Sequence, residues 1–242
     1  MALQKPTFKV NIGANAKATE RKTVFHDLKP DTTTQLRVLP PVTEEGLIFT
    51  KVTNHFKLKN EDNYGMALAC LEDHGNDETG EDCYLCALVK YLRKTGDKGD
   101  IKIANDLRAS PRWYLQALVY DSDTGTYFGP KLIGLSKTTA ETVNDLLVQQ
   151  ENSGDSFFCD PDEGQDLMIT RKGTGLNTKY TVSLTGRKAS LDDIFPEWTD
   201  KILTDVYAAI ELKIQDQDGQ KRAAYRTFDD ELDWASIEQH VG

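Results

Sequence analysis

The sequence predicts an α+β protein that is mainly β, built as a small β-barrel with an inserted lobe and peripheral helices. Three observations carry this prediction. Short runs in which apolar and polar residues alternate, or which are rich in β-branched residues, recur between turn signals. Helical patterns fall at the edges and towards the end of the 242-residue chain. Three of the four cysteines fall within CLEDHGNDETGEDCYLC, residues 70–86, which marks the inserted lobe.

The first part of the chain reads as a basic arm followed by two strands. Residues 1–30 carry little apolar pattern and include Lys5, Lys9, Lys17, Arg21 and Lys22. In TQLRVLPP, residues 34–41, polar and apolar residues alternate, and the predicted strand ends at a double proline. LIFTKVTNHF, residues 47–56, is rich in β-branched and aromatic residues. After Cys83 the apolar spacing becomes that of a helix face, so the CYLC pair opens a helix.

The second part predicts two hairpins and three helices. A polar connector over residues 95–111 leads into RWYLQALVYDSDTGTYFGPKLIGL, residues 112–135, a β-hairpin around a turn that ends at Gly125. Thr138 and Glu141 form a capping box before a helix over residues 141–150. DLMITRKG and NTKYTVSLTG form the second hairpin, and helices are predicted over residues 200–212 and 229–240.

The cysteine cluster predicts a structural zinc site. Cys70, Cys83 and Cys86 supply three thiolates, and a tetrahedral zinc needs a fourth ligand. His74 and His55 compete for that position, and strand pairing favours His55 because its partner strand would lead into Cys70. A redox dithiol is the weaker alternative, since the βαβ context is missing. Cys159 is expected to be a buried free thiol.

The distribution of charge and aromatic residues predicts a nucleic-acid surface. The net charge of −10 argues against a polyanionic partner, but residues 167–191 contain five cations and no acid. Bases stack on exposed rings while cations hold phosphates. Predicted phosphate contacts are Arg112, Lys131, Arg171, Lys172, Lys179, Arg187 and Lys188. Predicted stacking residues are Tyr114 together with one or more of Trp113, Tyr120 and Tyr180.

Several classes of protein find no support in the sequence. The chain contains no HExxH, GxSxG or GxxxxGK[ST] motif, and its Cys83 pair lacks the deaminase proline. A non-enzymatic protein is therefore expected. No run of eighteen apolar residues and no secretory signal appear, which predicts a soluble cytoplasmic protein without a membrane partner.

The order of the motifs along the chain resembles that of a known family. The motifs are NHF, C, HG and CxxC, then RWYLQALVYD, then DLMITRKG and LNTKYTVSL. The family is that of the single-stranded DNA-binding (helix-destabilising) proteins of T-even-like bacteriophages, the gene 32 protein type. The resemblance runs from about Thr34 to the last predicted helix. By position, His55, Cys70, Cys83 and Cys86 match the zinc ligands of the family, and His74 matches a histidine that does not bind metal. Trp113 and Tyr114 fall where the family has a Tyr-Trp pair beside its DNA cleft.

The resemblance implies a fold, a function and a set of partners. The fold would be a five-stranded OB-fold barrel over residues 31–228 with a zinc subdomain at about 55–94, a flexible arm at 1–30 and an acidic, helical segment at 229–242. The function would be sequence-independent coating of single-stranded DNA in replication, recombination and repair, in the cytoplasm of an infected bacterial host. The arm would promote self-association, and the acidic C-terminus would recruit replication proteins.

Two other readings of the sequence remain open. The first is a zinc-stabilised module that binds another protein and no nucleic acid, which buried aromatic rings would favour. The second is a zinc-dependent nucleic-acid enzyme, which a water-bearing coordination position would favour.

Overall fold

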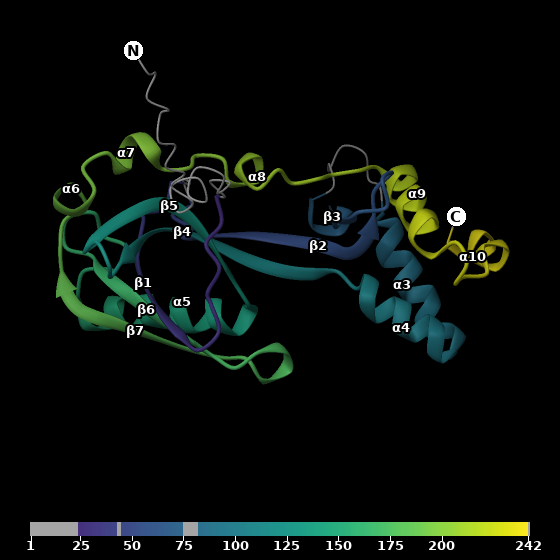
Figure 1. The fold of residues 1–242 in the computed structure, drawn as a ribbon, viewed down its shortest axis with the longest axis horizontal. Coiled ribbons are helices and arrows are strands. Elements are labelled where there is room, and N and C mark those ends of the chain that lie inside the picture. Colours follow the sequence, from purple (N-terminus) through teal and green to yellow (C-terminus); the bar gives the residue numbers. More distant parts are fainter. Residues whose placement is uncertain (1–23, 43–44, 75–81, 242) are drawn as a thin grey trace, which may run out of the picture.

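The computed structural model describes residues 24–42, 45–74 and 82–241, and Figure 1 shows an elongated molecule with two lobes. The strands are β1 (Thr32–Val38), β2 (Phe49–Lys59), β3 (Gly65–Ala69), β4 (Ser110–Asp121), β5 (Thr126–Leu135), β6 (Gln165–Lys172) and β7 (Lys179–Lys188). The helices are α2 (Leu71–His74), α3 (Tyr84–Thr95), α4 (Lys98–Leu107), α5 (Lys137–Ser153), α6 (Leu191–Ile194), α7 (Trp198–Lys201), α8 (Val206–Ala209), α9 (Gln217–Phe228) and α10 (Trp234–Val241). Most of the predicted arm, residues 1–23, lies outside the described residues.

Strand β4 is the centre of one seven-stranded antiparallel sheet. Strand β5 pairs along one edge of β4, while β2 and β1 pair in turn with residues 110–115 and 117–119 on the other edge. The sheet has the order β3-β2-β4-β1-β6-β7, with β5 beside β4. The predicted α+β class is therefore confirmed. Among the described strands no pairing closes the sheet into the barrel that was predicted.

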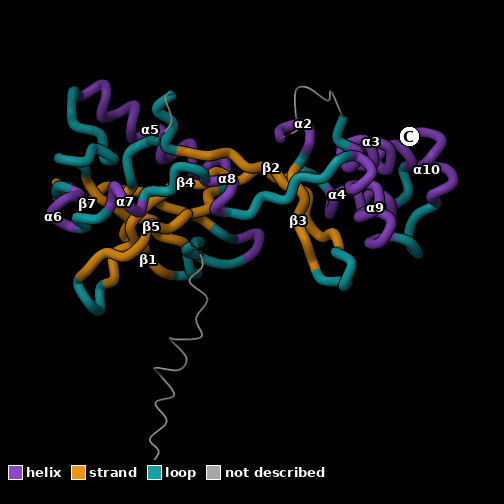
Figure 2. The backbone as a smooth tube through the Cα atoms, turned by 90° about the horizontal axis from the view of Figure 1, so that it is seen from above, coloured by secondary structure: helices purple, strands orange, loops and turns teal. Residues whose placement is uncertain are grey.

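The two larger buried cores lie in separate lobes, and Figures 1 and 2 show these lobes towards opposite ends of β2 and β4. The sheet lobe contains β1, β5, β6, β7 and α5, with core residues such as Leu36 and Leu167. The cysteine lobe contains β3, α3, α4, α9, α10 and the end of β2, with core residues such as Leu88 and Trp234. The cysteine lobe thus combines a segment before β4 with the C-terminal helices.

Helix α3 forms where the cysteine pair predicted it. Cys83 is its N-cap residue, and Leu85, Leu88, Val89 and Leu92 are buried on one face. Gly96 ends the helix at a φ of 76°, a left-handed conformation that glycine adopts at little cost. The predicted helix near residues 141–150 is the longer α5, and its capping residue is Ser136 rather than Thr138, because Ser136 accepts from the Thr139 N–H.

The helix predicted over residues 200–212 is wrong. The chain there forms the single turns α7 and α8, which are separated at Leu203. Gln116 on β4 donates its amide to the Leu203 carbonyl at 2.6 Å and accepts from the Leu203 N–H at 2.7 Å. A side chain of the sheet therefore takes both backbone groups that a continuous helix would need. The polar connector predicted over residues 95–111 is also wrong, because it contains α4, which Asp97 caps.

The described helices include none that could cross a membrane, because each is too short or too polar.

Candidate functional site

The cysteine lobe brings together the four predicted metal ligands. His55 lies on β2, Cys70 directly follows β3, and Cys83 and Cys86 lie at the start of α3. Their ligand atoms all lie within 4.8 Å of one another, and every member except Cys86 is fully buried. A β-bulge between His55 and Leu58 changes the register of β2 with β3 at this point. The hairpin and the helix thus meet at one buried group that could hold a metal ion.

The separations within this group fit tetrahedral coordination. The sulfur atoms of Cys70 and Cys86 lie 3.5 Å apart, and His55 Nε2 lies 3.3 Å from Cys83 Sγ and 3.7 Å from Cys86 Sγ. Around a tetrahedral zinc with its usual bond lengths, two sulfurs would lie roughly 3.8 Å apart and a sulfur and a nitrogen about 3.6 Å apart. The donor set and its spacing therefore both suit a zinc ion.

Two contacts from outside the group orient its members. His55 Nδ1 lies 2.6 Å from the carbonyl oxygen of Leu107, the last residue of α4, which leaves Nε2 directed at the thiols. An N–H bonded to a carbonyl is the usual way to fix a metal-binding imidazole. From α9, the buried Gln220 lies 3.4 Å from Cys83 Sγ and donates to the Ala69 carbonyl at 3.2 Å. Helices α4 and α9 of the cysteine lobe therefore both contact the candidate metal centre.

The pKa values of His55, Cys83 and Cys86 depend on neighbouring members of the group. Burial lowers the pKa of His55, but hydrogen bonds with Cys70 and Cys83 outweigh burial and raise the pKa to about 10. Hydrogen bonds from Cys70 and Cys86 lower the pKa of the Cys83 thiol, while hydrogen bonds with Cys70 and Cys83 raise the pKa of Cys86. A cation bound by these side chains would displace the protons that they share.

His74 and Cys159, the other histidine and cysteine considered in the sequence, lie away from the candidate metal centre. His74, at the end of α2, accepts the Thr53 N–H at 2.9 Å through Nε2, and its ring contacts Tyr207 edge-on. Cys159 is buried in the core of the sheet lobe, where burial raises the pKa of its thiol. The structure therefore separates both residues from the candidate metal centre.

A second candidate site is a groove across the sheet lobe, made of two adjoining hollows. The first has a volume of about 590 Å³ and lies beside residues 24–30, and the second, about 690 Å³, reaches the N-terminus of α5. Arg112, Arg171 and Tyr180 line both hollows, which makes them continuous. We call this surface the basic groove and define it by Lys29, Arg112, Tyr114, Arg171, Lys179 and Tyr180.

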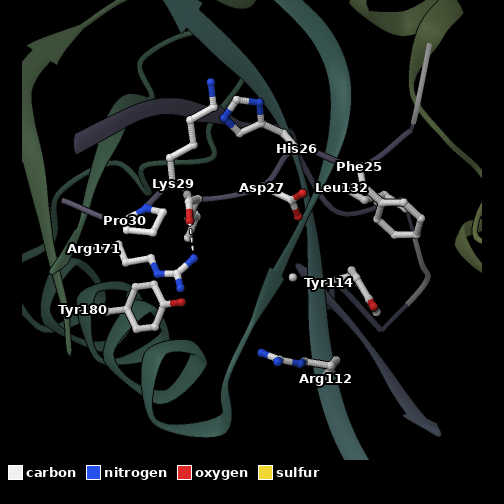
Figure 3. Close-up of a pocket in the computed structure, with 12 residues that line it drawn as sticks. Phe25, His26, Asp27, Lys29, Pro30, Arg112, Tyr114, Leu132, Arg171 and Tyr180 are labelled. Atoms are coloured by element: carbon white, nitrogen blue, oxygen red, sulfur yellow. Dashed lines mark hydrogen bonds between the residues drawn. The ribbon is translucent and has the colours of Figure 1, made fainter. Parts of the chain in front are cut away.

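Strand geometry places these side chains on facing walls. Arg112 and Tyr114 are two residues apart on β4 and so share a face, while Arg171 and Tyr180 pair directly across β6 and β7. Figure 3 shows the two pairs on opposite sides of the hollow, with the polar ends of Arg112, Arg171 and Tyr180 directed into it. Gly134 on β5 pairs with Tyr114, and a Cβ there would lie 3.1 Å from the ring. Glycine therefore leaves the space that the tyrosine ring occupies.

The basic groove carries a net positive charge, because its cations outnumber the one acidic residue among the described residues that line it. Lys29, Arg112, Arg171 and Lys179 supply four cations, and Asp27 lines the first hollow. Burial lowers the pKa of His26, so its imidazole adds no full charge at neutral pH. Arg171 donates to the Leu28 carbonyl at 2.7 Å, which fixes its guanidinium at the wall. Hydroxyls of Ser136, Thr138 and Thr142 near the start of α5 line the second hollow and can also bond to phosphates.

The other predicted nucleic-acid contacts are distributed over different surfaces. Tyr120 and Arg187 line a separate hollow of about 570 Å³. Trp113 packs against the core of the sheet lobe, because it lies on the opposite face of β4 from Tyr114. Lys188 forms an exposed ion pair with Glu163 at 3.4 Å. Lys172 is exposed at the end of β6, and Lys131 is half-buried on β5. The structure thus brings together five of the predicted contacts, Arg112, Tyr114, Arg171, Lys179 and Tyr180.

The wall formed by residues 24–30 was not predicted from the sequence. VFHDLKP was assigned to the arm because it lacks an extended apolar pattern, yet Phe25 and Lys29 line the first hollow. The alternation of Val24, His26 and Leu28 with Phe25 and Asp27 is too short to predict a strand. Pro30, which ends this stretch just before β1, was the one available signal that the segment is structured.

A groove that combines rings with cations is typical of proteins that bind single-stranded nucleic acid. Comparison with family models is consistent with this class, since the model described as gp32 DNA binding protein like matches residues 31–227. The match covers most of the chain, so the chain belongs to the gp32-like family of single-stranded DNA-binding proteins, as the sequence resemblance indicated. None of the curated proteins compared with the chain gives a significant match.

Proposed function

We propose that this protein is a non-enzymatic, sequence-independent single-stranded DNA-binding protein that coats and protects strands during phage replication, recombination and repair. The observation that carries the proposal is the basic groove, where cations from β4, β6 and β7 and the segment before β1 face two tyrosines. Membership of the gp32-like family supports it. The same reasoning implies that the protein acts in the cytoplasm of the infected bacterial host.

The groove offers separate contacts for the two parts of a nucleotide. Arg112 and Arg171 face each other across the hollow and can neutralise phosphates along the strand. Tyr114 and Tyr180 offer aromatic faces on which any base can stack, so sequence preference would be slight. In a duplex these base faces are already stacked, and a duplex should therefore bind less tightly.

We further propose that the group of His55, Cys70, Cys83 and Cys86 holds a structural zinc ion. Four protein ligands fill a tetrahedral site and leave no position for a reactive water, which disfavours a zinc-dependent enzyme. When bound, the ion would cross-link the β2–β3 hairpin to α3. The OB-fold assignment is also part of this proposal, and the antiparallel arrangement of β1, β4, β5, β6 and β7 in the sheet lobe supports it.

The competing function is a zinc-stabilised protein interaction module without nucleic-acid binding. That reading expects aromatic rings that only pack into the core, and Trp113, which is half-buried, does pack against the core of the sheet lobe. Tyr114 and Tyr180 are half-buried as well, but both line the first hollow, which favours nucleic acid. The module would regain support from a protein that binds no single strand at low salt.

The test of the proposed function is a comparison of labelled oligothymidylate with duplex DNA of equal length at several salt concentrations. We expect the single strand to bind much more tightly and the protein to lower the melting temperature of the duplex. Equal affinity for the two substrates would contradict the proposal.

Two partner interactions remain proposals that rest on the family. Residues 1–23, outside the described residues, would contact a neighbouring copy and make coating cooperative. Deleting them should then weaken binding to long strands far more than to short oligonucleotides, and equal losses would count against this role. The acidic segment over residues 229–242 would recruit replication proteins, which a pull-down with and without that segment would test.

A further inference from the structure

The stretch between the arm and β1 is held as a wall of the basic groove. The Leu132 N–H on β5 donates to the Val24 carbonyl at 2.8 Å, and the His26 N–H donates to the Leu132 carbonyl at 3.1 Å. Farther along, Arg171 donates to the Leu28 carbonyl at 2.7 Å. These three bonds attach the stretch to β5 at one end and to β6 at the other, and Phe25 lies between the first two.

Phe25 places its ring beside the tyrosine of the groove. The ring centroids of Phe25 and Tyr114 lie 5.7 Å apart with an interplanar angle of 51°, and both rings line the first hollow (Figure 3). Phe25 is 38% exposed, an unusual position for a phenylalanine that only fills a core. A large apolar ring that stays open to solvent beside cations is suited to a ligand with a flat apolar face.

The spacing of the two rings is close to that of a clamp for one base. A base stacked between two rings needs them about 7 Å apart, because each stacked contact takes roughly 3.5 Å. Opening the observed pair by about 1 Å and turning the rings parallel would admit one base. The two hydrogen bonds with Leu132 hold the backbone on either side of Phe25, so the change would come from rotation of the side chains.

We propose that Phe25 is a base-stacking residue that, together with Tyr114, clamps one base of the bound strand. This inference rests on the proposed single-stranded DNA-binding function and adds a residue and a segment to its site. Residues 24–30 belong to the DNA-binding surface, and the arm proper ends before them. Lys29, which lines the same hollow, places a cation within reach of the adjoining phosphate.

The test measures binding of an eight-nucleotide oligothymidylate, too short for coating, to the full chain and its variants. Phe25→Ala should weaken binding by about 5- to 150-fold, and Phe25→Tyr should restore it, because only the ring face is needed. Phe25→Leu keeps an apolar side chain against Tyr114 but no π-face, and it should bind nearly as weakly as the alanine variant. In a Tyr114→Ala background the loss caused by Phe25→Ala should shrink, since the clamp has already lost one side.

Three results would overturn the inference. Phe25→Ala that binds more tightly than wild type would show that the ring blocks the groove. Phe25→Leu that binds like wild type would show a packing role without stacking. Phe25→Ala that binds like wild type, while Tyr114→Ala weakens binding, would remove Phe25 from the site and leave the proposed function intact. Failure of the function itself is seen separately, as a wild-type protein that does not prefer single strands to duplex.

Discussion

Removing the proposed zinc ion with a chelator is expected to unfold the cysteine lobe and to leave the sheet lobe folded. His55, Cys70, Cys83 and Cys86 connect the β2–β3 hairpin to α3, and Cys70 and Cys83 are themselves part of the core that α9 and α10 complete. Structural zinc contributes about 10 kcal/mol or more to folding at such sites, which is comparable with the whole stability of a domain. The loss should therefore reach α9 and α10 through the contact between Gln220 and Cys83.

Hydrogen exchange followed by mass spectrometry would measure this effect lobe by lobe. Amides of α3, α9 and α10 should lose protection after chelation, while those of β1 and β6 should keep theirs. His55→Ala and Cys83→Ser should abolish zinc binding, whereas His74→Ala and Cys159→Ser are the matched controls that should retain one zinc per chain. Metal analysis that finds no zinc in purified protein never exposed to a chelator would contradict the zinc assignment.

Substitutions in the basic groove are expected to weaken binding in two distinguishable ways. Tyr114→Ala should cost about 1 to 3 kcal/mol of binding free energy at every salt concentration, because stacking depends little on salt. Arg112→Ala should cost more at low salt and make the salt dependence shallower. If Lys29, Arg112, Arg171 and Lys179 each neutralise one phosphate, log K should fall with log salt at a slope near −3, and each alanine should change the slope by about 0.7.

Matched controls exist on the same sheet lobe. Tyr120→Ala removes a tyrosine that lines the separate hollow, and Lys188→Ala removes a cation paired with Glu163. Both should change binding much less than their counterparts in the basic groove. A Tyr114→Ala variant and an Arg112→Ala variant that both bind like wild type would place the nucleic-acid site elsewhere.

The sequence predicts best where spacing alone determines structure. The strands around Leu36 and Tyr114 lie where strand-forming residues predicted them, and the Cys83 pair with Leu85 and Leu88 defines the start and face of α3. The four candidate ligands follow from the hairpin and this helix.

Elements that bury small or polar residues cannot be predicted from the spacing of apolar residues. Helix α9 buries Gly219, Gln220, Ala223 and Ala224 together with Phe228, so its inner face carries only one large apolar residue. Helix α4 buries Ile103, Ala104 and Leu107 within an otherwise polar stretch. The break at Leu203 comes from Gln116, a residue far away in sequence.

The basic groove could be predicted only in part, for a related reason. Strand alternation puts Arg112 and Tyr114 on one face, but it does not say which face borders the hollow. Only the pairing of β6 with β1 and β7 brings Arg171 and Tyr180 opposite that face and leaves Tyr120 and Arg187 at another hollow. The wall that carries Phe25 depends on two backbone bonds to Leu132, which no local pattern encodes.

The most direct test of the central claim is photo-crosslinking of the full chain to a single strand that carries 5-iododeoxyuridine, with the attached residues identified by mass spectrometry. Crosslinking follows contact between a base and an aromatic ring, so it reports where bases stack. The account predicts attachment at Tyr114, Tyr180 and Phe25, the rings that line the first hollow of the basic groove. Attachment confined to Tyr120 and Tyr127 of the separate hollow, or to the cysteine lobe, would contradict it.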